Sequence, residues 1–362
     1  MCERTNNEPR GKRKLKNIII AVASTLAGAS VAGVASAIVV YNAVFPRYER
    51  PDYNIYPGLY DYGKIKEILP RERLSFTSGS AKLSAYYYPS EDALGLVVLA
   101  HGFRAGADDY LPLIEAIVKG GYAVFTYDAT GTYDSGGDSA VGMCQSLCDL
   151  DRALNYIRKT ARYSDMPLFL VGHSWGGYAA ASVLELHPEV KACVCIAPMN
   201  DGTKIMLEKA EEHTGKIAYA AKPIFDAYQK YLFGDYVNYN GVRGINSTDI
   251  PILIAQGVDD TVITMKGQSI TAYRDKLTNP NVSYYFGKGA QGSHTGIWHS
   301  AAAEEYRKKV ASELKMRSSR LGRELTYAEK CDFYSGVDHR LYSEVNSELV
   351  ELMLNTFKKP IK

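Results

Sequence analysis

The longest apolar run of this chain lies near its amino terminus. Residues 18–41 contain no charged side chain. At about 1.5 Å per residue, a helix of this length crosses the roughly 30 Å hydrocarbon core of a bilayer. The run therefore predicts a transmembrane signal-anchor over residues 18–41. It leaves a basic tail over residues 1–17 and a juxtamembrane tether, which contains Tyr and Pro, over residues 42–70.

Basic residues flank this run unequally. Those before it are Arg4, Arg10, Lys12, Arg13, Lys14 and Lys16, and those shortly after it are Arg47 and Arg50. Because Lys and Arg accumulate on the cytoplasmic side, we expect a single-pass cell-membrane protein with a cytoplasmic amino terminus and the remainder outside. A cleaved signal peptide is the alternative, since residues 35–37, Ala-Ser-Ala, resemble a cleavage site. The apolar region of a signal peptide usually spans only about 7–15 residues, which favours the anchor.

Beyond residue 70, short apolar runs alternate with helical stretches. This alternation is typical of a mostly parallel sheet covered by helices on both faces, and it predicts an α/β domain over residues 71–362. The expected strands are residues 74–76, 83–88, 95–101, 122–128, 168–172, 190–197, 251–256 and 282–286. The expected helices are residues 109–119, 143–162 and, at the end of the chain, 341–357.

Two helical additions interrupt or extend this alternation. Between residues 200 and 246 the apolar positions take a helical spacing, and the segment lies between two expected strands. We interpret it as a helical cap over residues 201–249. Its apolar and aromatic side chains, which include Phe225 and Tyr228, indicate an acyl or aryl pocket. A second helical extension is expected over residues 300–340.

The composition excludes several classes of function. The net charge is only +2, from 42 basic and 40 acidic residues, and basic and aromatic residues do not interleave beyond residue 50. Both observations argue against a nucleic-acid partner. The six cysteines lack the paired spacing of a zinc site and do not form a dense disulfide framework. We interpret most of them as small core residues.

Residues 172–176, Gly-His-Ser-Trp-Gly, match the G-x-S-x-G pattern of a nucleophile elbow. The pentapeptide alone is weak evidence, but it lies where an apolar strand ends and a small-residue helix begins. A nucleophile elbow requires that context, because its serine occupies a strained turn and its flanking glycines avoid clashes with the neighbouring strand and helix. The pattern predicts Ser174 as a nucleophile.

A serine nucleophile that attacks a carbonyl needs two N–H groups to stabilise the oxyanion. Trp175, the residue after the serine, supplies one candidate N–H group. Phe103, which follows the expected strand at residues 95–101, supplies the other. His101 in the same loop is interpreted as an ordinary strand-end residue.

The acid and the base are expected later in the chain, after further strands. Asp259 and Asp260 both follow the expected strand at residues 251–256, and Asp201 is a third candidate for the acid. His294 lies in a Gly-rich loop after the last strand and is the candidate base, with His299 as a nearby rival. We interpret three other histidines as structural, namely His187, His213 and His339.

These residues together resemble the α/β-hydrolase superfamily, over about residues 74–298 and the closing helix. Within it the chain is similar to the serine aminopeptidase-like and monoglyceride lipase-like branch, and to bacterial cinnamoyl and feruloyl esterases. The matching motifs are residues 101–103, 128–136, 172–177, 257–262 and His294. The resemblance implies the α/β-hydrolase fold, Asp260 as the acid, and neither a metal nor a dissociable cofactor. The family usually has a glycine where Tyr133 stands, and this difference affects the shape of that loop, not the chemistry.

The combined expectation is a membrane-anchored serine hydrolase with an extracytoplasmic catalytic domain. It would cleave carboxylic ester or amide bonds of a small-molecule ester or short peptide through a Ser174–His294–Asp260 triad and an acyl-enzyme. The alternatives are a serine aminopeptidase-type peptidase, a thioesterase or an acyltransferase. A catalytically dead binding protein on the same fold is a different class, and the intact triad residues argue against it. The sequence predicts neither the natural substrate nor the oligomeric state.

Overall fold

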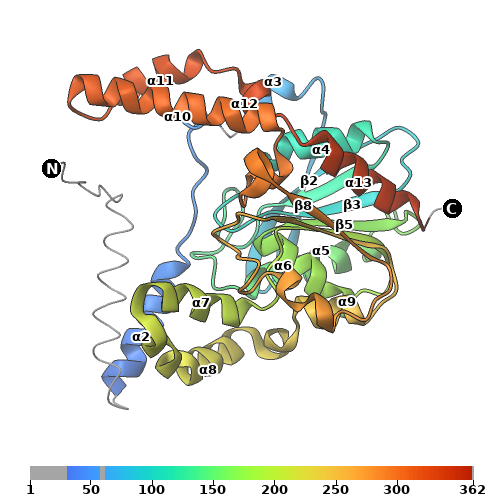
Figure 1. The fold of residues 1–362 in the computed structure, drawn as a ribbon. Coiled ribbons are helices and arrows are strands. Elements are labelled where there is room, and N and C mark those ends of the chain that lie inside the picture. Colours follow the sequence, from blue (N-terminus) through green and yellow to red (C-terminus); the bar gives the residue numbers. More distant parts are fainter. Residues whose placement is uncertain (1–30, 58–61, 361–362) are drawn as a thin grey trace.

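An eight-stranded sheet organises the computed structural model, which describes residues 31–57 and 62–360 (Figure 1). Its strand order is β1-β2-β4-β3-β5-β6-β7-β8. Strand β2 pairs antiparallel with β1 and β4, and every other pair is parallel. The strands are β1 (Glu72–Ser78), β2 (Ala81–Tyr88), β3 (Leu96–Ala100), β4 (Ala123–Tyr127), β5 (Leu168–His173), β6 (Val190–Ile196), β7 (Ile252–Gly257) and β8 (Val282–Gly287). The expected mostly parallel sheet is confirmed.

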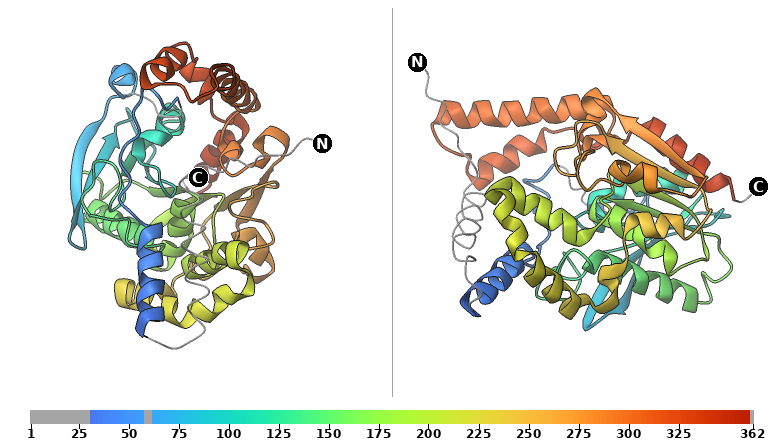
Figure 2. Two further views of the ribbon diagram at one scale, coloured as in Figure 1. Left: turned by 90° about the vertical axis from the view of Figure 1, so that its left-hand side faces the viewer. Right: turned by 60° about the horizontal axis from the view of Figure 1, so that its bottom comes forward.

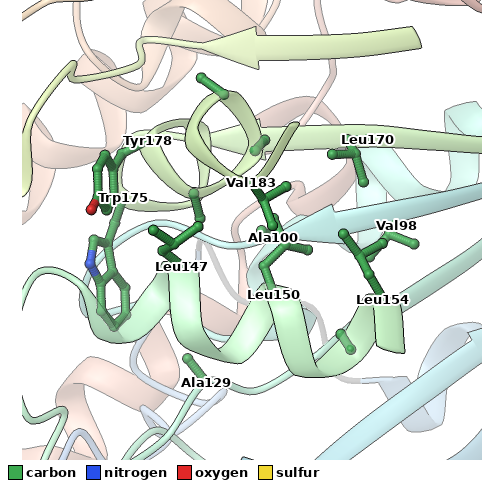
Figure 3. Packing of buried hydrophobic residues seen from close by; sticks show 14 of the residues in the cluster. Val98, Ala100, Ala129, Leu147, Leu150, Leu154, Leu170, Trp175, Tyr178 and Val183 are labelled. Carbon is green, nitrogen blue, oxygen red and sulfur yellow. The ribbon is translucent and has the colours of Figure 1, made fainter. Parts of the chain in front are cut away.

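Helices cover both faces of this sheet, as Figure 2 shows from two further sides. One face carries α4 (Leu111–Lys119) and α13 (Ser347–Lys358), and the other carries α5 (Gln145–Lys159), α6 (Trp175–Ser182) and α9 (Gly241–Asn246). Side chains of β3 alternate between the two cores, with Val97 packed toward α4 and Val98 toward α5. In Figure 3 Leu150 and Leu154 of α5 lie against Val98 and Ala100. Burial on both faces explains why these strands read as continuous apolar runs.

The cap and the helical extension are both present as helices. The cap contains α7 (Gly202–Thr214), η3 (Gly215–Ala221), α8 (Lys222–Phe233), η4 (Gly234–Asn238) and α9. The extension contains α10 (Ala301–Leu321), α11 (Tyr327–Ser335) and α12 (His339–Tyr342), and it projects from the body of the molecule (Figure 1). A small separate core stabilises it and consists of Val310, Leu325, Phe333 and Val337.

The closing helix begins later than expected. The pattern predicted a helix from residue 341, but α13 begins at Ser347. Val345 instead forms an isolated bridge with His299, and the Asn346 side chain accepts a hydrogen bond from Leu349 N at the start of α13. An Asn at this position caps a helix, because its side chain satisfies a free N–H group of the first turn.

The remaining elements are short. They are α3 (Tyr62–Ile65), η1 (Ala107–Tyr110), η2 (Val183–Glu185), η5 (Ile270–Lys276), η6 (Gly289–Gly292) and η7 (Gly296–Trp298). Helix α2 (Val31–Val44) is the described part of the long apolar run, and it lies against α8. The expected basic tail and residues 18–30 of the expected anchor fall outside the described residues. Within the described ranges, no helix is both long and apolar enough to cross a membrane.

Candidate active site

Ser174 occupies the sharp turn between β5 and α6. Its backbone has φ 55° and ψ −111°, a region that residues other than glycine rarely adopt. The flanking glycines permit close approach of the chain: a Cβ on Gly172 would lie 2.1 Å from Gly176 O, and a Cβ on Gly176 would lie 2.0 Å from Ala100 O. The turn is held by a hydrogen bond from Ser174 N to Ile196 O of 2.8 Å. This is the geometry that a nucleophile elbow requires.

Three side chains that are far apart in the sequence form one line of hydrogen bonds at the elbow. His294 Nε2 lies 2.9 Å from Ser174 Oγ. On the other side of the ring, His294 Nδ1 lies 2.7 Å from Asp260 Oδ2. Parallel strands direct their carboxyl ends to one edge, which is why the loops after β5, β7 and β8 meet here. The structure thus brings together the three residues predicted as nucleophile, base and acid.

The buried carboxylate of Asp260 is held by several donors. Its Oδ1 accepts from Val262 N and Ile263 N, both at 2.8 Å, and its Oδ2 also accepts from Gln256 Nε2 at 3.0 Å. Burial raises the pKa of Asp260, but the hydrogen bonds from His294 and the two backbone N–H groups outweigh burial and lower it. Asp260 is therefore ionised at neutral pH. An ionised acceptor keeps the proton on Nδ1 of His294 and leaves Nε2 free to accept one.

The rival candidates lie in other arrangements. Asp259 is exposed to solvent. Asp201 caps α7, where its side chain accepts from two backbone N–H groups. His299 is buried beside Glu304 and Arg307, at 3.0 Å from the Glu304 carboxylate and 2.8 Å from the Arg307 guanidinium. These contacts explain the positions of the three residues without a role at Ser174.

The loop that follows β3 lies against the elbow. A Cβ on Gly102 would be 3.2 Å from His173 Nδ1, and the Phe103 ring contacts the Trp175 ring at a centroid distance of 5.5 Å. Trp175 is the first residue of α6, where a backbone N–H has no acceptor within its own helix. The structure therefore places Trp175 directly after the nucleophile and packs the ring of Phe103, the other oxyanion-hole candidate, against Trp175.

A hydrogen-bonded chain that no sequence pattern indicated connects three loops of this site. Gly102 N donates to Tyr110 Oη at 2.9 Å, and Tyr110 Oη lies 2.7 Å from His173 Nδ1. His173 Nε2 lies 3.1 Å from the backbone oxygen of His294. Because a carbonyl only accepts, Nε2 carries the proton and Nδ1 accepts from the Tyr110 hydroxyl. Burial, followed by the nearby His294, lowers the pKa of His173 to about 3, so its ring is neutral.

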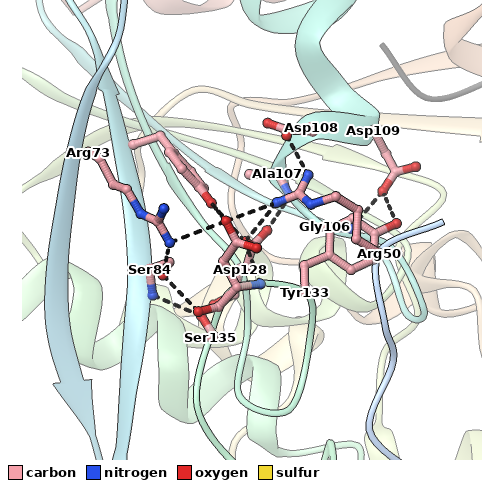
Figure 4. Close-up of polar contacts among 12 residues, drawn as sticks. Arg50, Arg73, Ser84, Gly106, Ala107, Asp108, Asp109, Asp128, Tyr133 and Ser135 are labelled. Carbon is pink, nitrogen blue, oxygen red and sulfur yellow. Dashed lines mark hydrogen bonds and ion pairs between the residues drawn. The ribbon is translucent and has the colours of Figure 1, made fainter. Parts of the chain in front are cut away.

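A second network, drawn in Figure 4, joins the loop after β3 to the loop after β4. The carboxylate of Asp108 forms ion pairs with Arg50 and Arg71. Asp128 Oδ1 accepts from Ala107 N at 2.8 Å. Burial raises the pKa of Asp128 to about 6, against the lowering effect of that N–H group and of Arg50. Buried carboxylates with cationic and N–H partners fix a loop firmly, because separating them leaves a charge uncompensated.

Tyr133, which stands where the resembled family usually has glycine, keeps the left-handed backbone that glycine favours. Its φ is 43°. Its hydroxyl donates to Asp109 Oδ2 at 2.7 Å.

Within the described part of the chain, no group of three or more His, Cys, Asp or Glu side chains is arranged to hold a metal ion.

Comparisons with known proteins find a matching family model and structures of similar fold. Residues 91–242 match a family model described as serine aminopeptidase, S33. The matched range includes Ser174 and ends before Asp260 and His294. The structure is similar to that of an esterase from Pyrococcus furiosus, with a TM-score of 0.53 and 19% identity over 75% of this chain and 98% of the other. A Butyrivibrio proteoclasticus protein solved with bound ferulic acid gives a TM-score of 0.48 and 16% identity, over 61% of this chain and 90% of its own. A search of curated proteins finds no match.

Proposed function

Because the chain has the α/β-hydrolase fold and residues 91–242 match a serine aminopeptidase model, we propose that it is a serine hydrolase that cleaves carboxylic esters through an acyl-enzyme. The observation that carries the proposal is the line of hydrogen bonds from Asp260 through His294 to Ser174. A serine hydroxyl is a weak nucleophile on its own. It becomes effective when a base within hydrogen-bond reach takes its proton, and when a third group orients that base.

The reaction follows from these positions. His294 Nε2 takes the proton of Ser174 Oγ as Oγ bonds to the carbonyl carbon of the ester. Negative charge then develops on the carbonyl oxygen, where the N–H groups of Trp175 and Phe103 stabilise it. His294 returns the proton to the departing alkoxide, which leaves an acyl-enzyme on Ser174. Water, activated by the same ring, releases the acid and restores the serine.

Asp260 has a supporting role in both halves of the reaction. Its ionised carboxylate fixes the tautomer of His294 and stabilises the imidazolium that forms when the ring takes a proton. The two backbone N–H groups on Oδ1 and the Gln256 amide on Oδ2 keep this carboxylate in place. Asp260 remains charged throughout and exchanges no proton with substrate.

Aromatic side chains beside the elbow support an ester with an apolar or aryl acyl group. Phe103 contacts Trp175 beside the elbow, and the cap carries Phe225 and Tyr228 on α8. Binding sites for apolar groups are built from such side chains, with a few polar atoms that set orientation. The match to a serine aminopeptidase model favours a second candidate, the amide bond of a peptide with a free amino terminus.

We further propose that the protein is a single-pass membrane protein with its catalytic domain outside the cytoplasm. The uncharged run that begins at residue 18 and the excess of basic residues before it support this orientation. Ala37 and Tyr41 near the end of the run are buried in the protein, so the proposed span ends before them. Alkaline carbonate extraction of membranes tests the anchor, since a spanning helix resists it. Amino-terminal sequencing tests cleavage: a mature start near Ile38 would reject the anchor and leave the chemistry unchanged.

The activity is tested on the full-length protein in detergent. A fluorophosphonate probe should label the wild type and not the Ser174→Ala variant. A panel of p-nitrophenyl esters and aminoacyl-arylamides then ranks ester against amide cleavage. We expect the fastest turnover with an apolar acyl ester. Faster cleavage of the arylamides would favour the peptidase, and an unlabelled wild type would favour a binding protein without hydrolase activity.

A further inference from the structure

We propose that residues 45–50, which the sequence pattern assigned to a tether, are a fixed part of the catalytic centre and position the loop that carries the Phe103 N–H. We call residues 45–50 the docked segment. The inference rests on the proposed function, because it concerns the oxyanion hole of that same reaction.

The backbone of the docked segment is bound to the loop that follows β4. Tyr48 N donates to Gly131 O at 2.9 Å, and Tyr133 N donates to Tyr48 O at 2.9 Å. Ala140 N donates to Phe45 O at 3.1 Å. The segment therefore makes sheet-like hydrogen bonds at two separate points. A loose tether would leave these groups to water.

The side chain of Arg47 strengthens this attachment. Its Nη1 donates to Ser135 O at 2.8 Å and to Gly137 O at 3.0 Å, and its Nη2 donates to Tyr133 O at 2.5 Å. A planar guanidinium suits this task, because it presents several N–H donors in a fixed geometry. At the end of the segment, Arg50 pairs with the buried carboxylate of Asp108.

The aromatic rings of the docked segment reach the oxyanion-hole candidates. The Phe103 ring contacts Phe45 and Tyr48, each at a centroid distance of 5.4 Å, and Trp175 at 5.5 Å. The interplanar angles are 66°, 78° and 78°, the edge-to-face geometry that aromatic rings favour. Phe103 is thus packed between the docked segment and the residue that follows the nucleophile.

The loop needs this support because its backbone is strained. Arg104, directly after Phe103, has a φ of 65°. Strained conformations persist only where the surrounding structure holds them. The Arg104 guanidinium lies over the Tyr48 ring at 5.7 Å, and its Nε donates to Tyr48 Oη at 3.4 Å. Without the docked segment the loop is free to relax, and the Phe103 N–H loses its alignment with the developing oxyanion.

The test compares Phe45→Ala with Phe76→Ala in the full-length protein. Both changes remove a buried ring with aromatic neighbours, but Phe76 lies on the edge strand β1 against Phe125, Tyr127 and Tyr156. With an activated ester, Phe45→Ala should lower kcat by about 10- to 100-fold and leave KM within about twofold, since a misplaced oxyanion donor weakens the transition state. Phe76→Ala should keep kcat within about twofold at a temperature where it is folded.

A second pair keeps the test decisive if Phe45→Ala fails to fold. Tyr48→Ala removes the ring contact with Phe103, whereas Tyr48→Phe keeps it, so only Tyr48→Ala should lose about 10-fold or more in kcat. Wild-type kcat in a folded Tyr48→Ala, or in a folded Phe45→Ala, would overturn the inference alone. A wild type that neither hydrolyses esters nor reacts with fluorophosphonate would reject the proposed function, and this inference with it.

Discussion

Replacing Tyr110 with Phe removes one oxygen that joins two loops of the site. In the structure this hydroxyl accepts from Gly102 N at 2.9 Å and lies 2.7 Å from His173 Nδ1. Burial raises the pKa of Tyr110, so the hydroxyl stays protonated and donates to the histidine. Tyr110→Phe leaves both partners buried and unpaired. The shape of the ring is otherwise unchanged.

The magnitude follows from those two lost partners. A buried polar group without a hydrogen bond costs about 1–3 kcal/mol, so with two such groups Tyr110→Phe should lower the free energy of unfolding by about 2–6 kcal/mol. Without the Tyr110 hydroxyl, the His173 ring is no longer fixed in orientation. The backbone carbonyl of His294, which is hydrogen-bonded to that ring, is then no longer fixed either. Misplacement of a catalytic group by a fraction of an ångström lowers turnover, here by about 10- to 100-fold in kcat.

Tyr122→Phe is the matched control for this prediction. Tyr122 is also fully buried, but its hydroxyl has no hydrogen-bond partner among the described residues. Its removal should change the free energy of unfolding by less than about 0.5 kcal/mol and leave kcat unchanged. Urea unfolding and p-nitrophenyl ester hydrolysis measure the two effects. If Tyr110→Phe and Tyr122→Phe have the same unfolding midpoint and the same kcat, the hydrogen-bonded chain holds nothing in place.

Three further predictions concern single side chains. Asp260→Asn should lower kcat by about 10³–10⁴-fold, since an amide no longer fixes the His294 tautomer, and Asp259→Asn should stay near wild type; equal losses would contradict the assignment. His294→Ala should lower kcat by about 10⁴-fold or more, whereas His299→Ala should retain activity in its folded fraction; an inactive but folded His299→Ala would reverse the roles. Burial lowers the pKa of His187, but Asp151 and Glu189 outweigh burial and raise it. His187 therefore makes its full contribution to the free energy of unfolding below the unfolded-state pKa, about 6.5. That contribution is lost as pH rises through the folded-state pKa. His187→Gln should remove this part of the pH dependence in urea unfolding at pH 5 to 9, and an unchanged pH profile would refute it.

Local patterns in the sequence were sufficient to predict the sheet. Strands buried on both faces need apolar side chains at nearly every position, so β3 and the first four residues of β5 and β7 stand out without any knowledge of their neighbours. The elbow pattern is local too: its five residues are contiguous, and Gly172 avoids a clash with Gly176 inside the pattern. The start of α13 was predicted too early, since the chain from Ser343 to Asn346 is held by a contact with His299, which is distant in the sequence.

The site was harder to predict where a choice depended on burial. Asp259 and Asp260 are adjacent and chemically identical, and spacing alone left both open. Their environments differ in the structure: Asp260 is buried under four hydrogen bonds, and Asp259 is exposed. The role of Tyr110 in the site could not be predicted from the sequence, because it lies in an apolar stretch that also predicts an ordinary helix.

The docked segment shows the same limit on a larger scale. Arg47 and Arg50 were counted as the short basic flank of an anchor, because a sequence pattern reports only how many charges lie near an apolar run. The partners that attach these two side chains to the domain lie between about 60 and 90 positions further along the chain, and they include Asp108, Tyr133, Ser135 and Gly137. Such pairs have no period and no composition signal. A truncated domain that begins at residue 71 would therefore lose the ring contacts of Phe45 and Tyr48 with Phe103.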